Sequence, residues 1–405
     1  MLCLPPLKAH YLSGGHAAGV CAARRRQCGA AAAAAPCLGC ELDAAFARAF
    51  APPPPGARRP PWSPAALLAA WWRSAEALAS YQQQDAHEFF LSLIEAVHTT
   101  TSSCGGNGGN GGNGGGGGSA TPRAAAAALL RSPSGLGSPR AGFGAGAGGC
   151  DADCGCAMHR AFGGLLRSDV VCAGCGGVST SLDPFVDVSL ELPAATGAAQ
   201  PPPPLTLASC LRRFTRPERL GGGARVLACA ACGALQAGTK QLSFAAAPPA
   251  LCLHLKRFAH GDGAHAAAGG DGGGGTGGAA AAAAAAAEAS KLDAHVAFPL
   301  DELDLGPFLA PARLRARAGL RVSGESPSGG RGDAPRCRYW LAAAVCHVGS
   351  LEGGHYVAYA RHGGAWFRCD DSWVAAAPAA EVAAQQAYLL FYVAHAVTAQ
   401  RPPGA

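Results

Sequence analysis

The clearest chemical signal in the sequence lies near its C-terminal end. His355 follows Gly353-Gly354 and starts an alternating apolar stretch, and Asp370-Asp371 ends the next one. A histidine that begins one strand and an aspartate that ends its neighbour can meet across a hairpin. Asp370 would then hold one ring nitrogen of His355 and leave the other to activate a nucleophile. The alternative is an ordinary strand histidine beside a turn, and these residues alone leave both interpretations open.

Cysteine spacing predicts a zinc site in the middle of the chain. Cys172-x-x-Cys175 and Cys229-x-x-Cys232 have the spacing that lets four thiolates surround one tetrahedral zinc ion, Zn²⁺. The Pro-rich stretch 194–204 and a strand expected at 185–192 account for their wide separation. Free cysteines are the less favoured alternative, because many of the 18 cysteines occur in C-x-x-C or C-x-C pairs, a usage that suits a reducing compartment.

A second possible metal site combines histidine and cysteine. Cys154-x-Cys156-x-x-His159 offers three ligands, and His98, at the end of an expected helix, is the natural fourth. Such a site would close the intervening Gly-rich loop.

A third set lies near the N-terminus. Cys37-x-x-Cys40 is a good half-site, and His16 with Cys21 would complete it, although Cys28 could replace Cys21. Ordinary surface residues are the alternative for His16 and Cys21.

The elements that must position these residues change type along the chain. Residues 65–98 have apolar residues at helical spacing on both sides of a Gln-rich break at 82–84, which predicts two helices. From 185 onward the pattern alternates as in strands. The strands are expected at 185–192, 251–258, 339–348, 355–361, 366–369 and 388–393. Helices followed by strands indicate the α+β class.

Low-complexity stretches interrupt this pattern at 104–149, 194–204, 261–290 and 322–336. Their Gly, Ala, Pro and Ser content predicts disordered surface loops. No block between them has a complete pattern of its own, so we expect insertions within one fold.

Composition and charge limit the kinds of partner and location that we expect for this chain. The net charge is +6 and the arginines are scattered, so direct nucleic-acid binding is not expected. The start of the chain lacks the pattern of a secretory signal, and no apolar run is long enough for a membrane span. We therefore expect a soluble intracellular protein.

Three motifs together resemble the ubiquitin-specific proteases. They are Gly354-His355-Tyr356 with Trp366 and Asp370-Asp371, the stretch Tyr81-Gln82-Gln83-Gln84-Asp85-Ala86-His87-Glu88-Phe89-Phe90, and Leu253-His254-Leu255-Lys256-Arg257-Phe258. They occur in the family's order, which a single chance match would not produce.

The resemblance implies a papain-like right-hand fold. The thumb would be helical (1–100), the fingers would be β-rich and carry the zinc ribbon (150–245), and the palm would carry the histidine box (246–395). It also implies His355 as general base, Asp370 as its partner and Asp371 as a supporting neighbour. Asp85 would face the arginine-bearing tail of ubiquitin, and Gly353 and Gly354 would border its channel.

The nucleophile that the resemblance implies is missing from this sequence. The family carries it in a Gly-Asn-Thr-Cys string followed by an aromatic residue, and no such string occurs here. Cys3, beside Pro5 and Pro6, lacks that context. Two interpretations follow: a truncated version of an active cysteine protease, which we favour, or a short form without peptidase activity. Either way, this chain as given is expected to be inactive.

The extra His/Cys sets and the stretch 209–218 resemble one branch of the family, the deubiquitinase subunit of the SAGA transcriptional coactivator. That resemblance implies removal of ubiquitin from histone H2B, dependence on partner subunits of the SAGA deubiquitinase module, and location in the nucleus, with the cytoplasm as a second location. The competing hypothesis is a zinc-stabilised ubiquitin-binding or scaffold protein that does not cleave.

Overall fold

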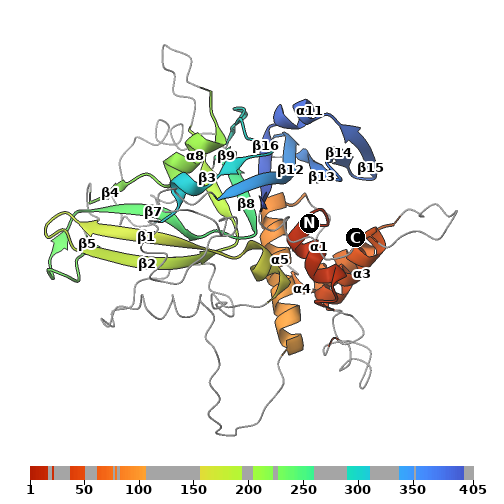
Figure 1. The fold of residues 1–405 in the computed structure, drawn as a ribbon, viewed down its shortest axis with the longest axis horizontal. Helices are drawn as coiled ribbons and strands as arrows, with labels where there is room; N and C mark the ends of the chain where they lie inside the picture. Colours follow the sequence, from red (N-terminus) through yellow and green to blue (C-terminus); the bar gives the residue numbers. More distant parts are fainter. Residues whose placement is uncertain are drawn as a thin grey trace, which may run out of the picture.

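The computed structural model describes residues 1–16, 21, 37–50, 62–75, 78–79, 83–105, 156–193, 204–221, 227–259, 290–310, 337–350 and 353–395. The four stretches predicted to be disordered loops lie outside these ranges, apart from residues 104, 105, 204 and 290. In the described part, the helices of the first half of the chain gather at one end, and a four-stranded and an eight-stranded sheet form most of the rest (Figure 1).

The helical end is built from five helices of the first half of the chain. They are α1 (Pro5–Leu12), α3 (Leu38–Phe50), α4 (Ala65–Ser74), α5 (Ala86–Gly105) and α7 (Ala157–Phe162). Leu7, Phe46, Trp71 and Val97 are among the buried residues that join these helices to one another and to the sheet. Proline starts α1, where its missing N–H costs nothing.

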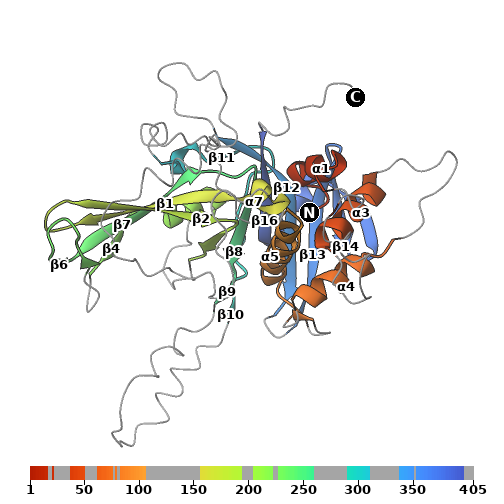
Figure 2. The same cartoon turned by 90° about the horizontal axis from the view of Figure 1, so that it is seen from below.

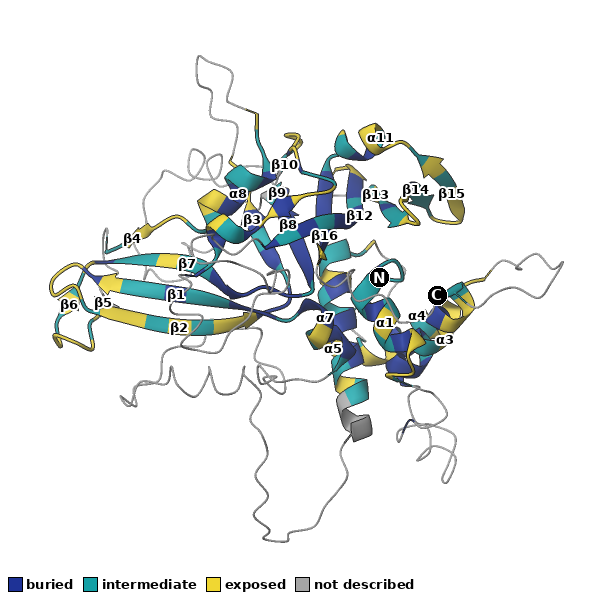
Figure 3. Cartoon of the chain, viewed as in Figure 1, coloured by how far each residue is buried: buried dark blue, intermediate teal, exposed yellow. Residues whose placement is uncertain are grey.

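An eight-stranded sheet lies against these helices and carries the C-terminal motifs (Figure 2). Its order is β15-β14-β13-β12-β16-β8-β3, with β11 also paired to β12. The strands are β3 (Val188–Glu191), β8 (Ala250–Lys256), β11 (Leu303–Asp304), β12 (Arg338–Gly349), β13 (Gly354–His362), β14 (Ala365–Asp370), β15 (Trp373–Ala377) and β16 (Ala387–Ala394). All pairs are antiparallel except β3 with β8. The central strand β16 is buried throughout, so this sheet holds the core (Figure 3).

A second sheet projects away from the helices. It has the order β2-β1-β7-β4 and consists of β1 (Gly164–Cys172), β2 (Val178–Phe185), β4 (Glu218–Leu220) and β7 (Gly238–Ala246). The pair β5 (Leu227–Ala228) and β6 (Leu235–Gln236) lies at its far end. Exposed and half-buried residues predominate along β2 (Figure 3), so both faces of this sheet are partly open to solvent.

Short elements complete the described chain. They are α8 (Leu207–Phe214), β9 (Phe258–Ala259), β10 (Ser290–Lys291), a 3₁₀ turn at Gly306–Phe308 and α11 (Ala379–Ala383). Thr206 and Ser209 form a reciprocal capping box at the start of α8. No described helix has both the length and the apolar character needed to cross a membrane.

The α+β prediction is confirmed, and the two helices expected within 65–98 correspond to α4 and α5. The single strand expected at 185–192 is instead two strands, because β2 ends at Phe185 and β3 begins at Val188. β3 falls in the range predicted for the fingers but pairs with β8 in the eight-stranded sheet. The boundaries of thumb, fingers and palm stay a prediction.

Candidate active site and metal centres

The structure brings His355 and Asp370 together across neighbouring strands. His355 lies at the start of β13 and Asp370 at the end of β14. The Nε2 atom of His355 lies 2.6 Å from Oδ1 of Asp370. This hydrogen bond leaves Nδ1 as the ring nitrogen that could accept a proton from a nucleophile.

The contact between His355 and Asp370 stabilises the charged form of each residue. The hydrogen bond that His355 donates to Asp370 raises the pKa of His355 and lowers the pKa of Asp370. Asp371 lies in the same group, with side-chain ligand atoms within 4.8 Å of those of His355 and Asp370. Its φ of 52° is left-handed, as tight hairpin turns require, so Asp371 also shapes the turn between β14 and β15.

Asp85 lies at the start of α5, where its carboxylate accepts four hydrogen bonds. Oδ1 accepts the backbone N–H groups of His87 and Glu88, at 2.8 and 3.0 Å. Oδ2 accepts the hydroxyls of Tyr356 and Tyr388, at 3.1 and 2.6 Å. Asp85 therefore caps α5 and ties it to β13 and β16, a structural role that the sequence did not reveal.

Gly353 and Gly354 lie immediately before His355 in a closely packed turn. The backbone N–H of Gly354 donates to Oε1 of Gln83 at 3.0 Å. A Cβ atom at Gly354 would lie 2.1 Å from Nε2 of His347, which no side chain can accommodate. At Gly353 the nearest such contact is 4.0 Å away, at Oε1 of Gln83, so this glycine has space beside it.

Cys172, Cys175, Cys229 and Cys232 form one cluster at the far end of the four-stranded sheet. Their sulfur atoms all lie within 4.8 Å of one another, and those of Cys175 and Cys229 are 3.6 Å apart. Four sulfurs at zinc–sulfur distance in a tetrahedron are about 3.8 Å apart, so the donor set fits a tetrahedral ion.

The two halves of this cluster are built alike. Gly176 and Gly233 each follow the second cysteine of a pair, with φ of 69° and 70°. Each donates its N–H to the carbonyl of the first cysteine of the pair, Cys172 or Cys229. The backbone amides of Cys232 and Ala231 lower the pKa of Cys229 to about 6, which favours the thiolate form that binds metal.

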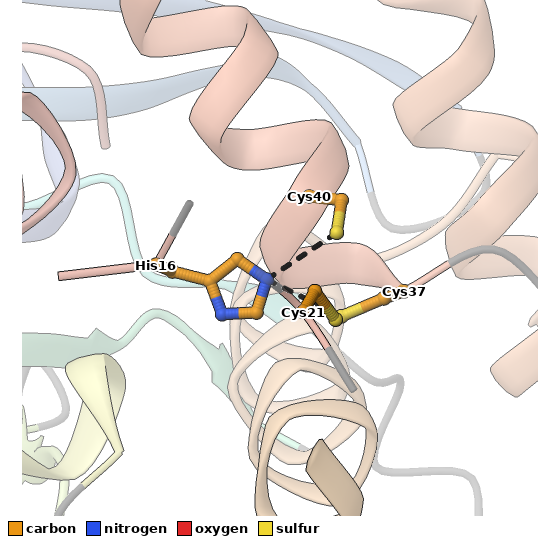
Figure 4. Close-up of side chains that lie close together, drawn as sticks. All are labelled: His16, Cys21, Cys37 and Cys40. Atoms are coloured by element: carbon orange, nitrogen blue, oxygen red, sulfur yellow. Dashed lines mark hydrogen bonds between the residues drawn. The ribbon is translucent and has the colours of Figure 1, made fainter. Parts of the chain in front are cut away.

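A second cluster joins the N-terminal segment to α3 (Figure 4). His16 points its Nε2 at the sulfurs of Cys40 and Cys37, at 3.4 and 3.6 Å, and Cys21 lies beside them. Burial lowers the pKa of His16 and raises that of Cys40. A neutral imidazole is ready to bind a metal, whereas a buried thiol needs a cation nearby to ionise. Cys21 occupies the fourth position, and Cys28 lies outside the described residues.

The third cluster contains His98, Cys156 and His159. The sulfur of Cys156 lies 3.1 Å from Nδ1 of His159, and the rings of His98 and His159 are 4.9 Å apart. Ligand atoms of all three lie within 4.8 Å of one another. Cys154, the remaining member of the predicted set, lies outside the described residues.

The active-site region also contains residues that sequence reasoning missed. Arg368 donates from Nη2 to Oδ2 of Asp370 at 2.9 Å. Its position two residues before Asp370 on one strand was the only available signal, because alternate residues share a face. Tyr356 belongs to the motif around His355, but no pattern in the sequence indicated that Tyr356 and Tyr388 contact Asp85.

The fold and the site define a class. A helical unit packed on a mostly antiparallel sheet, with a histidine and an aspartate paired on adjacent strands, is the papain-like arrangement of cysteine hydrolases. The profile of the family "Ubiquitin carboxyl-terminal hydrolase" matches residues 2–392. The chain belongs to that family, and within it to the ubiquitin-specific proteases close to the SAGA deubiquitinase.

Known relatives show where the similarity lies. Ubiquitin C-terminal hydrolase 22 of Arabidopsis thaliana is 34% identical over 268 residues, 60% of this chain and 43% of that protein. Ubiquitin carboxyl-terminal hydrolase 27 of Mus musculus is 35% identical over 255 residues, 59% and 51% of the two chains. The chain thus aligns with about half the length of these relatives.

A solved structure extends the match to the fold. The SAGA Ubp8/Sgf11/Sus1/Sgf73 DUB module bound to ubiquitin aldehyde contains a chain that matches with a TM-score of 0.62 and 25% identity. The match covers 97% of this chain and 65% of that one.

Proposed function

We propose that this chain is the ubiquitin-recognising and proton-transferring part of a cysteine-type deubiquitinase that hydrolyses the isopeptide bond at the ubiquitin C-terminus. The observation that carries the proposal is the 2.6 Å bond between His355 Nε2 and Asp370 Oδ1, in a chain of the ubiquitin carboxyl-terminal hydrolase family. A paired, partly exposed histidine is the expected general base of such a reaction.

In this mechanism the ring of His355 does the proton transfer. Asp370 holds Nε2–H, so Nδ1 accepts the proton of an attacking thiol and later returns it to the leaving amine. Water then resolves the acyl-enzyme with His355 again as base. The ion pair with Asp370 stabilises the imidazolium that forms in each step.

The ubiquitin tail would pass beside Gly353 and Gly354 toward His355. The space beside Gly353 supports this path, since a side chain there would narrow it. We assign Asp85 to the arginine-bearing part of the tail. Because its carboxylate already accepts four hydrogen bonds, an arginine would have to share these oxygens.

Zinc is the metal that we assign to the three Cys/His clusters. Thiolate and imidazole ligands at tetrahedral spacing suit this ion. The Cys172 cluster would stiffen the end of the four-stranded sheet, which grips the body of ubiquitin in this proposal. The other two would hold together segments of the helical end.

The thiol is the component that this sequence lacks. The 405 residues contain no Gly-Asn-Thr-Cys string. The thiol of Cys3 lies 3.9 Å from the carbonyl oxygen of Ala342. We therefore propose that the chain as given binds ubiquitin without cleaving it. The second candidate function, a zinc-stabilised ubiquitin-binding or scaffold protein, is favoured by this same observation.

The cellular assignment follows from the relatives. The matched structure is a SAGA deubiquitinase module bound to a ubiquitin derivative. We propose that this chain binds equivalent module subunits in the nucleus and that its substrate is ubiquitinated histone H2B.

One experiment separates the two candidates. The chain is expressed with zinc, alone and with an upstream segment carrying a Gly-Asn-Thr-Cys-Phe string fused before Met1, and both are assayed on a fluorogenic ubiquitin C-terminal reporter. We expect the fusion to cleave and the unfused chain only to bind. His355→Gln should abolish cleavage by the fusion.

His362→Gln is the matched control, since His362 ends the same strand. A fusion that binds ubiquitin but never cleaves would favour the scaffold. Cleavage by the unfused chain would refute the account of the missing thiol. Absence of ubiquitin binding by both would refute both candidates.

A further inference from the structure

Arg368 occupies the side of Asp370 that faces away from the histidine. Residues 368 and 370 lie on the same face of β14, because alternate residues of a strand share a face. Nη2 of Arg368 donates to Oδ2 of Asp370 at 2.9 Å, while Oδ1 of the same carboxylate meets His355 at 2.6 Å. Each carboxylate oxygen therefore has its own partner.

Arg368 does not extend freely into solvent. Its side chain is 39% exposed, yet its Nε atom is buried and has no hydrogen-bond partner among the described residues. Burying an unbonded N–H is unfavourable, so other contacts must hold the guanidinium. They are the ion pair with Asp370 and the ring of Trp373, whose centre lies 5.8 Å from the guanidinium carbon.

We propose that Arg368 is a positioning residue for the His355–Asp370 pair. It fixes the plane of the Asp370 carboxylate, so that Oδ1 points at Nε2 of His355 and the imidazole presents Nδ1 to the nucleophile. Trp373, which pairs with Asp370 across β14 and β15, covers the guanidinium and restricts the conformations open to the Arg368 side chain. The inference rests on the proposed function, because positioning matters only if His355 is the base.

The charged, titratable and aromatic groups around Arg368 come from four strands and a helix. Asp370 and Asp371 lie at the end of its own strand, and His355 lies on β13. Tyr359, its cross-strand neighbour on β13, donates to Glu381 of α11 at 2.8 Å. β15 contributes Trp373, and β12 contributes Cys346, which lies near Tyr359.

The effect of Arg368 on each group has a definite sign. Together with the stronger bond from His355, it lowers the pKa of Asp370, so the carboxylate stays ionised. It partly opposes the rise in the pKa of His355 that Asp370 causes. Removal of Arg368 should therefore raise the pKa of both groups and loosen the bond between them.

The test uses the zinc-loaded 405-residue chain and does not depend on cleavage. Asp370 is titrated by carboxyl ¹³C NMR and His355 by imidazole ¹⁵N NMR, and the Nε2–H proton signal of His355 is followed with temperature. In Arg368→Met we expect an upward shift of both pKa values and loss of the Nε2–H signal at a lower temperature. Arg368→Lys should restore the pKa values but not the signal, because a lysine supplies charge without the planar fork.

Arg361→Met is the matched control, since Arg361 pairs with Asp301 instead, at 2.6 Å. If Arg368→Met matches this control in both titrations and in the Nε2–H signal, the proposal is wrong. If Arg368→Met fails to fold, Arg368→Lys is compared with the unmodified chain instead. An unchanged Nε2–H signal in Arg368→Lys would then show that the proposal is wrong. If the NMR test fails but the fusion cleaves the reporter, the positioning proposal is wrong and the proposed function stands. If the NMR test succeeds but the chain binds no ubiquitin, the positioning proposal stands and the proposed function is wrong.

Discussion

The four hydrogen bonds of Asp85 predict that this residue contributes to stability before it contributes to binding. In Asp85→Ala the cap of α5 is lost, at about 1 kcal/mol. The hydroxyls of the buried Tyr388 and the half-buried Tyr356 also lose a charged acceptor, at about 1.5 kcal/mol each. Allowing for coupling among these bonds, we expect the free energy of unfolding to fall by about 3 to 4 kcal/mol.

The variant Asp85→Asn keeps the helix cap but removes the negative charge, so it measures the contribution of the charge alone. Asparagine caps helices as well as aspartate does, so only the charge-assisted part of the two tyrosine bonds should be lost, about 1 to 2 kcal/mol. Urea denaturation of the zinc-loaded chain, followed by tryptophan fluorescence, measures both variants. Glu88→Ala is the control, because Glu88 is exposed in the same helical turn and should change stability by less than about 0.5 kcal/mol.

The pH dependence gives a second measurement of the same interaction. Burial alone would raise the pKa of Asp85, but the bonds from Tyr388, from the amides of Glu88 and His87 and from Tyr356 outweigh it and lower the pKa. A lowered folded-state pKa means that the stabilisation is present above the ordinary value of about 3.9 and is lost as the pH falls through the folded-state pKa. The gap between the unmodified chain and Asp85→Asn should close over that range. Equal stability of the unmodified chain and Asp85→Ala at neutral pH would refute the reasoning.

Three further predictions concern the active-site pair and the metals. Asp370→Asn should lower the pKa of His355, because the carboxylate is the main cause of its rise; a histidine NMR titration measures this, and no change would mean that the pair does not form in solution. Native mass spectrometry should find three zinc ions per chain, and Cys232→Ser should remove one of them; retention of all three would exclude Cys232 as a ligand. Gly233→Ala should weaken the Cys172 cluster by about 1 kcal/mol, because a φ of 70° is strained with a Cβ atom; zinc competition with a chelator measures the change, and unaltered affinity would show that the loop relaxes.

The features that the sequence predicted are those with short-range signals. The C-x-x-C spacing identified the Cys172 cluster, because ligands two residues apart on a tight turn meet one ion wherever the turn lies. Short apolar and alternating stretches typical of strands identified β12, β13, β14 and β16 in the eight-stranded sheet. His355 and Asp370 could be paired because they lie at the open end of the hairpin that β13 and β14 form.

The missed features depend on the tertiary structure. β2 has no regular alternation of buried and exposed residues, because both faces of its sheet are partly open, and so it gave no period-two signal. The partners of Asp85 lie 271 and 303 residues away, on β13 and β16. No local pattern can indicate such a contact, and only the resemblance to a family singled out Asp85.

The spacing of residues 83, 85 and 87 explains why the motif before α5 is so informative. Gln83 accepts the N–H of Gly354, the residue next to His355. Asp85 binds Tyr356 and Tyr388, and His87 binds Asp187 at 2.8 Å and stacks on His254, with ring centres 3.9 Å apart.

Three alternate side chains thus attach the start of one helix to points along the sheet from β13 to β8. His254 belongs to the motif 253–258 and Gly354 to the motif that contains His355, so all three motifs meet at this helix end. The motifs that predicted chemistry in the sequence therefore also hold the helical unit against the strand that carries the proposed base. Loss of the side chain of Gln83, Asp85 or His87 is therefore expected to loosen the contact between this helix and the sheet that carries His355.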